Sequence, residues 1–111
     1  MRLVNLTPHR LRLVQTDGVT LELAPEGLAR CETTRAHAYG LPLDGGRSIT
    51  VHRVVVGAVT GLPDPRDDVR YVVSRQVAEA VAAHRTDCLI VDETVRDEQG
   101  RIVGARALAI L

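Results

Sequence analysis

Three polar residues alternate near the start of the chain: Asn5, Thr7 and His9, with Pro8 directly before the histidine. An imidazole titrates near neutral pH, so His9 has the side chain best suited to act as a general acid or base. Pro8 holds Thr7 in extended geometry and interrupts strand pairing. We therefore expect a bend at Pro8 that leaves His9 at a strand end, beside a potential site.

A second candidate position combines Ser74 with Arg75. The sequence predicts a short strand over residues 70–73 and a helix directly after it, so Ser74 suits the N-cap of that helix. The free N–H groups of residues 75–77 and the Arg75 guanidinium favour an anion, such as a phosphate or a carboxylate.

These two positions form one anion-binding corner if the first strand lies beside residues 70–73. The ligand-binding residues predicted on this basis are Asn5, Thr7, His9, Ser74 and Arg75, with Arg85 and Asp87 as neighbours.

Catalysis is the alternative. A hydrolase or phosphodiesterase would use His9 as general acid or base, and it would need Asp87, Asp92 or Glu93 within hydrogen-bond reach. Ser74 holds the strand-to-helix position of the α/β-hydrolase nucleophile, but the G-x-S-x-G elbow is missing and capping accounts for the serine. No catalytic residue is assigned, and a non-enzymatic protein is the leading expectation.

Motifs for metals and cofactors are missing. The histidines (His9, His37, His52 and His84) form no H-x-H or H-E-x-x-H pattern. The acidic loop GLPDPRDD at 61–68 lacks the alternating ligands and closing Glu of an EF-hand. No G-x-G-x-x-G or P-loop is present. Cys31 and Cys88 are expected to be buried small hydrophobes. We predict no metal and no cofactor.

The composition limits the partners. The 111 residues fit one domain, 1–111, and 14 basic residues balance 14 acidic ones, which argues against general nucleic-acid binding. Every basic residue is arginine, which indicates high-GC codon bias rather than selection for anion recognition. No apolar run is long enough to span a membrane, and the start of the chain lacks a signal-peptide region, so we expect a cytoplasmic protein that does not bind membranes.

The candidate residues depend on a β-rich framework for their positions. Apolar and polar residues alternate on both sides of Asp17-Gly18, whose glycine supplies the positive φ of a hairpin turn. Residues 28–34 predict another strand, residues 36–47 a loop or loose hairpin, and residues 48–59 a long strand. In that long strand, the apolar run Val54–Val56 favours a central position covered on both faces, and Gly57 indicates a bulge.

The hydrophobic period changes in the last third of the chain. Residues 74–85 predict the principal helix, with a stripe of small apolar residues. A strand follows at 88–91, and the remainder predicts a terminal hairpin around residues 97–100. The segment 70–91 is long enough for a parallel crossover, although nothing requires one. The predicted fold class is α+β, a mostly antiparallel β-sheet with one principal α-helix (about 74–85) and a C-terminal β-hairpin.

Two stretches together resemble a family of small uncharacterised proteins of actinobacteria and their phages. They are NLTPH at 5–9 and GLPDP…YVVSRQVAEAV…RTDCLIVDETVRDEQGRIVG at 61–104. The family pattern often closes with Gly-Cys, where this chain has Gly104-Ala105. No activity is known for the family, so the resemblance implies a high-GC bacterial or phage setting and assigns no site residue.

Three functional hypotheses follow. The leading one is a small binding module that accepts a small anionic ligand or a protein partner. The second is the hydrolase or phosphodiesterase with His9. The third is a structural assembly protein of a phage or bacterial particle. A homo-oligomer fits the first and third, because a sheet with only two aromatic residues gains from shared aliphatic surface and has edges to cover.

Overall fold

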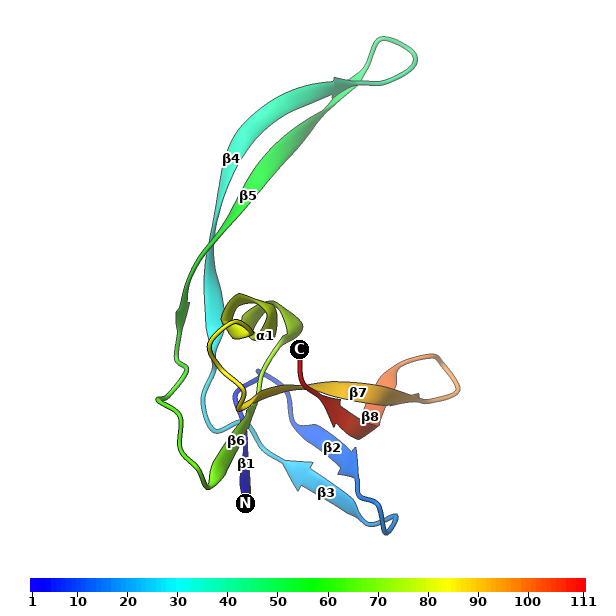
Figure 1. Ribbon diagram of the computed structural model, residues 1–111. Coiled ribbons are helices and arrows are strands. Elements are labelled where there is room, and N and C mark those ends of the chain that lie inside the picture. Colours follow the sequence, from blue (N-terminus) through cyan, green and yellow to red (C-terminus); the bar gives the residue numbers. More distant parts are fainter.

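The computed structural model describes all 111 residues as eight strands and one helix. They are β1 (Arg2–Asn5), β2 (Leu11–Val14), β3 (Thr20–Leu23), β4 (Arg30–Pro42), β5 (Ser48–Thr60), β6 (Val69–Val72), α1 (Arg75–Val81), β7 (Cys88–Arg96) and β8 (Ile102–Ala109). Six strands form the sheet of a body, and β4 and β5 form a separate two-stranded ribbon that extends from it (Figure 1). The α+β class is confirmed.

The body sheet has the order β1-β6-β7-β8-β2-β3. Its β2–β3 and β7–β8 pairs are antiparallel, whereas β1–β6, β6–β7 and β2–β8 are parallel. The sheet is therefore mixed rather than mostly antiparallel as expected. The parallel pairs join strands distant in sequence, or strands on either side of a helix, and local sequence patterns do not encode such pairings.

Both predicted tight hairpins are present. Between β2 and β3, Gly18 takes a φ of 86°, and the Val19 amide donates to the Asp17 side chain. Between β7 and β8, Gly100 takes a φ of 79°, and the Asp97 carboxylate accepts from the Arg101 amide. In each turn a glycine supplies the left-handed conformation and an aspartate accepts hydrogen bonds from nearby amides. Both turns can therefore be predicted from the local sequence.

Helix α1 connects β6 to β7 and makes this unit a parallel crossover. Ser74 is its N-cap, with a side chain that accepts from the Val77 amide, as predicted. The helix ends at Val81, four residues before the predicted end. The amides of His84 and Arg85 both donate to the Val81 carbonyl, so a tight turn replaces the last predicted helical turn.

The core lies between α1, strands β6 and β7, and the chain that leads into the ribbon. Its members are small and mostly aliphatic: Leu6, Ala29, Val69, Tyr71, Val73, Val77, Ala78, Val81, Cys88 and Ile90. Tyr71 is the one aromatic ring in it. Cys31, Val59 and Leu62 pack against this cluster and attach the ribbon to the body.

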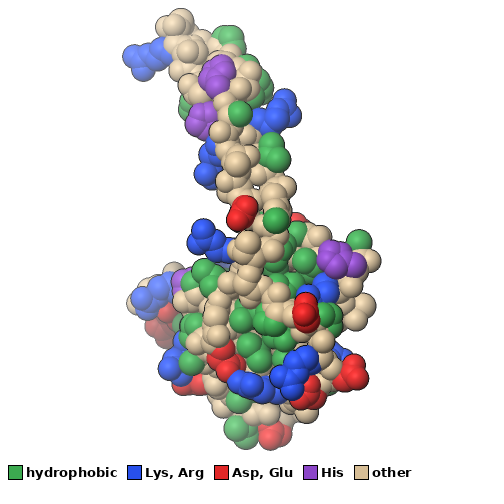
Figure 2. Space-filling view, turned by 90° about the vertical axis from the view of Figure 1, so that its left-hand side faces the viewer, with side chains coloured by type: hydrophobic (Ala, Val, Ile, Leu, Met, Phe, Trp, Pro, Cys, Tyr) green, Lys and Arg blue, Asp and Glu red, His purple; other side chains and the backbone are tan.

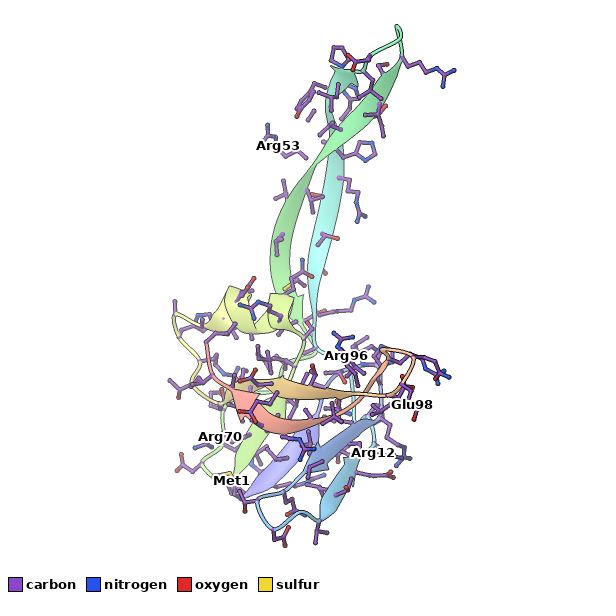
Figure 3. All side chains as sticks on the ribbon, turned by 90° about the vertical axis from the view of Figure 1, so that its right-hand side faces the viewer. Met1, Arg12, Arg53, Arg70, Arg96 and Glu98 are labelled. Carbon is purple, nitrogen blue, oxygen red and sulfur yellow. The ribbon has the colours of Figure 1, made fainter.

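The ribbon, called the arm below (residues 30–60), departs most from expectation. Residues 36–47, expected as a loop or a loose hairpin, form the far end of a long hairpin, in which residues 36–42 continue β4 and pair with β5 as far as Pro42 opposite Ser48. Val54, Val55 and Val56 were expected in a buried central strand, and all three are exposed. They belong to a two-stranded ribbon with nothing on either face (Figures 1 and 3). The bulge expected at Gly57 is present, opposite Glu32.

Candidate functional site

The predicted N-terminal cluster is a hydrogen-bonded bend. Asn5 ends β1 beside Val72 of β6, and its side chain is fully buried. Its Nδ2 donates to the carbonyls of His9 (2.7 Å) and Leu23 (3.0 Å), and its Oδ1 accepts from the amide (2.9 Å) and hydroxyl (2.7 Å) of Thr7. The bend at Pro8 is thus fixed by a satisfied amide, and neither polar end of Asn5 is free for a ligand.

His9 is exposed, and its imidazole makes no hydrogen bond. Only its main-chain carbonyl takes part in the bend. No hydrogen bond connects the ring to Asp87, Asp92 or Glu93, the carboxylates that the hydrolase hypothesis requires. The Asp87 carboxylate accepts hydrogen bonds from Arg85 instead. That hypothesis remains a prediction, without a second group in contact with the histidine.

Ser74 and Arg75 lie at the carboxyl-end edge of β6, near Asn5, as the corner hypothesis requires. The Ser74 hydroxyl caps α1, and Arg75 Nε donates to Glu79 Oε1 at 2.9 Å on the exposed side of the helix. The positions of the Ser74 and Arg75 side chains are therefore both explained by hydrogen-bond partners within the chain.

Arg85 and Asp87 lie at the other end of the crossover, where β7 begins. The guanidinium donates from Nε to Asp87 Oδ1 (2.8 Å), from Nη2 to Oδ2 (2.9 Å), and from Nη2 to the Pro63 carbonyl (2.7 Å). The side chains are only 11% and 9% exposed. Hydrogen bonding to the guanidinium lowers the pKa of Asp87 and the same contact raises that of Arg85. The pair fastens the loop 61–68 to β7.

The seven predicted residues therefore divide into two groups at opposite ends of the crossover. The Arg85–Asp87 end borders a polar hollow of about 280 Å³. Its other lining residues, which the sequence reading did not select, are Pro65, Arg66, Asp67, Arg70, His84 and Thr86. Arg66 lies in the loop before β6 and Arg70 lies in β6, and no short motif links them to His84.

An apolar hollow of about 320 Å³ opens between β2 and β8. Its apolar lining is Leu11, Leu13, Val91, Ile102, Val103 and Ala105, and His9, Arg10 and Arg12 lie at its polar side. Ile102 and Val103 are exposed. The two strands share only the Leu13–Ala105 register pair, so they diverge and leave the hollow open.

Seven of the fourteen large apolar side chains that are exposed in this chain lie on the arm. Its exposed large apolar side chains are Tyr39, Leu41, Leu43, Ile49, Val54, Val55 and Val56. Between the bulge at Glu32 and Ala58, only Ala38 and Val51 are even partly buried. Sequence analysis missed this surface because a continuous apolar run has the same pattern whether or not other elements cover it.

Comparisons with family models, with curated proteins and with solved structures found no match to this chain. The resemblance to small actinobacterial and phage proteins therefore stays a prediction. No helix is long and apolar enough to cross a membrane. No group of three or more His, Cys, Asp or Glu side chains comes together as a metal site.

Proposed function

We propose that this protein is a non-enzymatic protein-binding module and that the arm is its contact surface. The observation that carries the proposal is the arm itself, two 13-residue strands whose apolar side chains beyond the base are mostly exposed. Contiguous exposed apolar surface of this kind marks protein interaction sites in soluble proteins.

The physical argument is one of stability. A two-stranded ribbon is at best marginally stable in water, because neither of its faces is packed. Only the base of the arm contacts the core, through Cys31 and Val59. Val54, Val55 and Val56 are each about half exposed, so full burial of one of them would gain about 0.8–1.5 kcal/mol, half of the value for a fully exposed side chain. A partner that covers the arm therefore stabilises both the complex and the ribbon.

Position-specific photo-crosslinking in cells tests the proposal. A photoreactive amino acid replaces Val55 on the arm, and in a matched control it replaces Val19 in the β2–β3 hairpin. The two valines are 54% and 57% exposed, so they differ in place rather than in accessibility. We expect discrete protein adducts from Val55 and none from Val19.

Two results would contradict the proposal. Equal adduct formation at both positions would mean that the arm is not a preferred contact surface. Adducts at Val55 that disappear after nuclease treatment would mean that the arm binds nucleic acid instead of protein.

A small anion is the second candidate, favoured by the polar hollow beside Arg85 and Asp87. Arg66, Arg70 and His84 line it, and none of them is buried. Inorganic phosphate should raise the melting temperature, and Arg70→Ala should remove that rise. If the corner at α1 binds the anion instead, Arg75→Ala should remove the rise. No rise with phosphate contradicts both versions.

A further inference from the structure

We propose that the arm docks on the body of a second copy of this chain, with its apolar face over the hollow between β2 and β8. The inference rests on the proposed function and names the partner. Three features support it: the way in which the arm gathers its apolar side chains on one face, the distribution of ion pairs, and the presence of the hollow.

The register of the arm gathers large apolar side chains on one face. Val55, Val51 and Ile49 alternate along β5 and so share a face. On β4, His37 pairs with His52, but Tyr39 pairs with Val51, so Ala38 is an extra residue. This bulge moves Tyr39 and Leu41 from the histidine face to the valine face. The apolar face of the arm is defined here as Tyr39, Leu41, Ile49, Val51 and Val55.

The charges of the arm lack partners within the chain. Its four arginines, Arg30, Arg35, Arg47 and Arg53, make no ion pair and no side-chain hydrogen bond, and Arg53 extends away from every other element (Figure 3). With Glu32 and Asp44 the arm has a net charge of +2, so the other residues of this neutral chain carry −2.

The body carries the complementary charge. Six of its twelve acidic residues make no ion pair: Asp17, Asp64, Asp67, Asp92, Glu93 and Glu98. Figure 2 shows basic side chains along the arm and nearly all visible acidic ones on the body. Two arms would repel each other, whereas an arm and a body attract.

The apolar hollow is a suitable receptor for the apolar face. Its volume of about 320 Å³ equals that of about ten water molecules, enough for more than one arm side chain. The polar side of the hollow carries Arg10 and Arg12, both paired with Glu22, and Asp92, which follows the lining residue Val91 in β7, can meet Arg53 of the arm. The arm of the same copy extends away from β2 and β8, so only another copy can supply it (Figure 1).

The contact joins two different patches, so each copy can give an arm and receive one, and the smallest closed assembly is a dimer. Nucleic acid is a poorer fit, because the apolar face contains a single arginine, Arg53, among its large apolar side chains.

Solution mass with a complementation design tests this contact. Leu41→Asp alters the arm and Val103→Asp alters the hollow, at residues that are both 43% exposed, and Val19→Asp is the control. By light scattering after gel filtration, wild type and control should have at least twice the 12.1 kDa chain mass. Each arm or hollow variant alone should be a monomer with an unchanged circular dichroism spectrum.

The mixture of the two variants is the decisive sample. The Val103→Asp chain keeps an intact arm and the Leu41→Asp chain keeps an intact hollow, so one contact can form and a 1:1 complex should appear. A monomeric wild type, an unaffected Leu41→Asp variant, or a mixture that stays monomeric would each overturn the inference. If a variant unfolds, photo-crosslinking of the purified chain from Val55 takes its place: adducts at twice the chain mass support the inference, and their absence overturns it.

Failure of this inference and failure of the proposed function give different results. If Val55 adducts in cells contain a different protein and the purified chain is a monomer, the second-copy inference falls and the protein-binding function stands. If Val55 yields no protein adducts at all, both fall.

Discussion

Replacement of Arg85 by methionine should destabilise this protein far more than any surface arginine replacement. The variant keeps an apolar stem but leaves the Asp87 carboxylate buried without its bidentate partner and the Pro63 carbonyl without its donor. Breaking a buried pair in this way costs about 3–5 kcal/mol. For 111 residues, about 4 °C in melting temperature corresponds to 1 kcal/mol, so we expect a drop of about 12–20 °C.

The matched control is Arg75→Met. Arg75 pairs with Glu79 at a similar distance, 2.9 Å, but the two side chains are 68% and 56% exposed. Solvent screens this pair, so its loss should cost only about 0.3–0.5 kcal/mol. Urea denaturation at neutral pH measures both variants on the same scale. Equal costs for the two variants would refute the conclusion that Arg85 and Asp87 act as a buried structural pair.

The pH dependence of the unfolding free energy provides a second test of the Arg85–Asp87 pair, because its direction is defined. In the wild type the folded pKa of Asp87 lies below its ordinary value of 3.8, so its stabilisation is present above that pH and is lost as the pH falls through the lower folded value. In Arg85→Met, burial without a cation should raise the pKa of Asp87 instead. As the pH falls, Asp87 is then protonated at a higher pH in the variant than in the wild type, which removes the cost of its buried charge. The difference in unfolding free energy between wild type and variant should therefore narrow from pH 7 toward pH 4. A gap that widens would contradict the assignment.

Two further predictions concern the base of the arm and the thiols. Gly61 and Gly100 both have a φ of 79°, but a Cβ at Gly61 would overlap the Leu28 carbonyl, whereas nothing lies within 4 Å at Gly100. Gly61→Ala should therefore lower the urea midpoint much more than Gly100→Ala, and equal losses would contradict the close contact. Burial raises the pKa of Cys88 to about 11, so Ellman's reagent should label the partly exposed Cys31 first, with Cys88 reacting only on unfolding. Equal rates would contradict this.

The parts of the fold that sequence reasoning predicted are local ones. The turn residues Asp17-Gly18 and Asp97–Gly100 require particular backbone angles and amide partners, so they are readable without tertiary context. Ser74 was recognised as an N-cap for the same reason. The helix end was placed too late because residues 82–85 are compatible with a helix, and only the tight turn after Val81 excludes them.

The wrong predictions concern features that depend on tertiary packing. The run Val54–Val56 fits a doubly covered strand, and in this chain the cover is missing. Parallel pairing of β1 with β6 and of β2 with β8 joins distant segments, so no local pattern encodes it. Strand order in the body was unpredictable for the same reason.

The candidate site shows the same division. Asn5 was predicted to line the corner if the first strand lay beside residues 70–73, and that pairing is present, but the four hydrogen bonds of its side chain are all internal. Arg85 and Asp87 were selected as neighbours of the corner, and they bind each other at the opposite end of the crossover. The arm surface was missed because its apolar residues were assigned to a core.

Amide hydrogen exchange across residues 32–58 tests most directly whether the arm is a contact surface for a second copy of this chain. In the wild type at concentrations where it is assembled, a covered arm should exchange slowly, as its strand amides and side chains are shielded. In Leu41→Asp the same residues should exchange rapidly, while the core strands β6 and β7 keep their protection. Equally rapid exchange of the arm in both proteins would contradict the docking of the arm on a second copy.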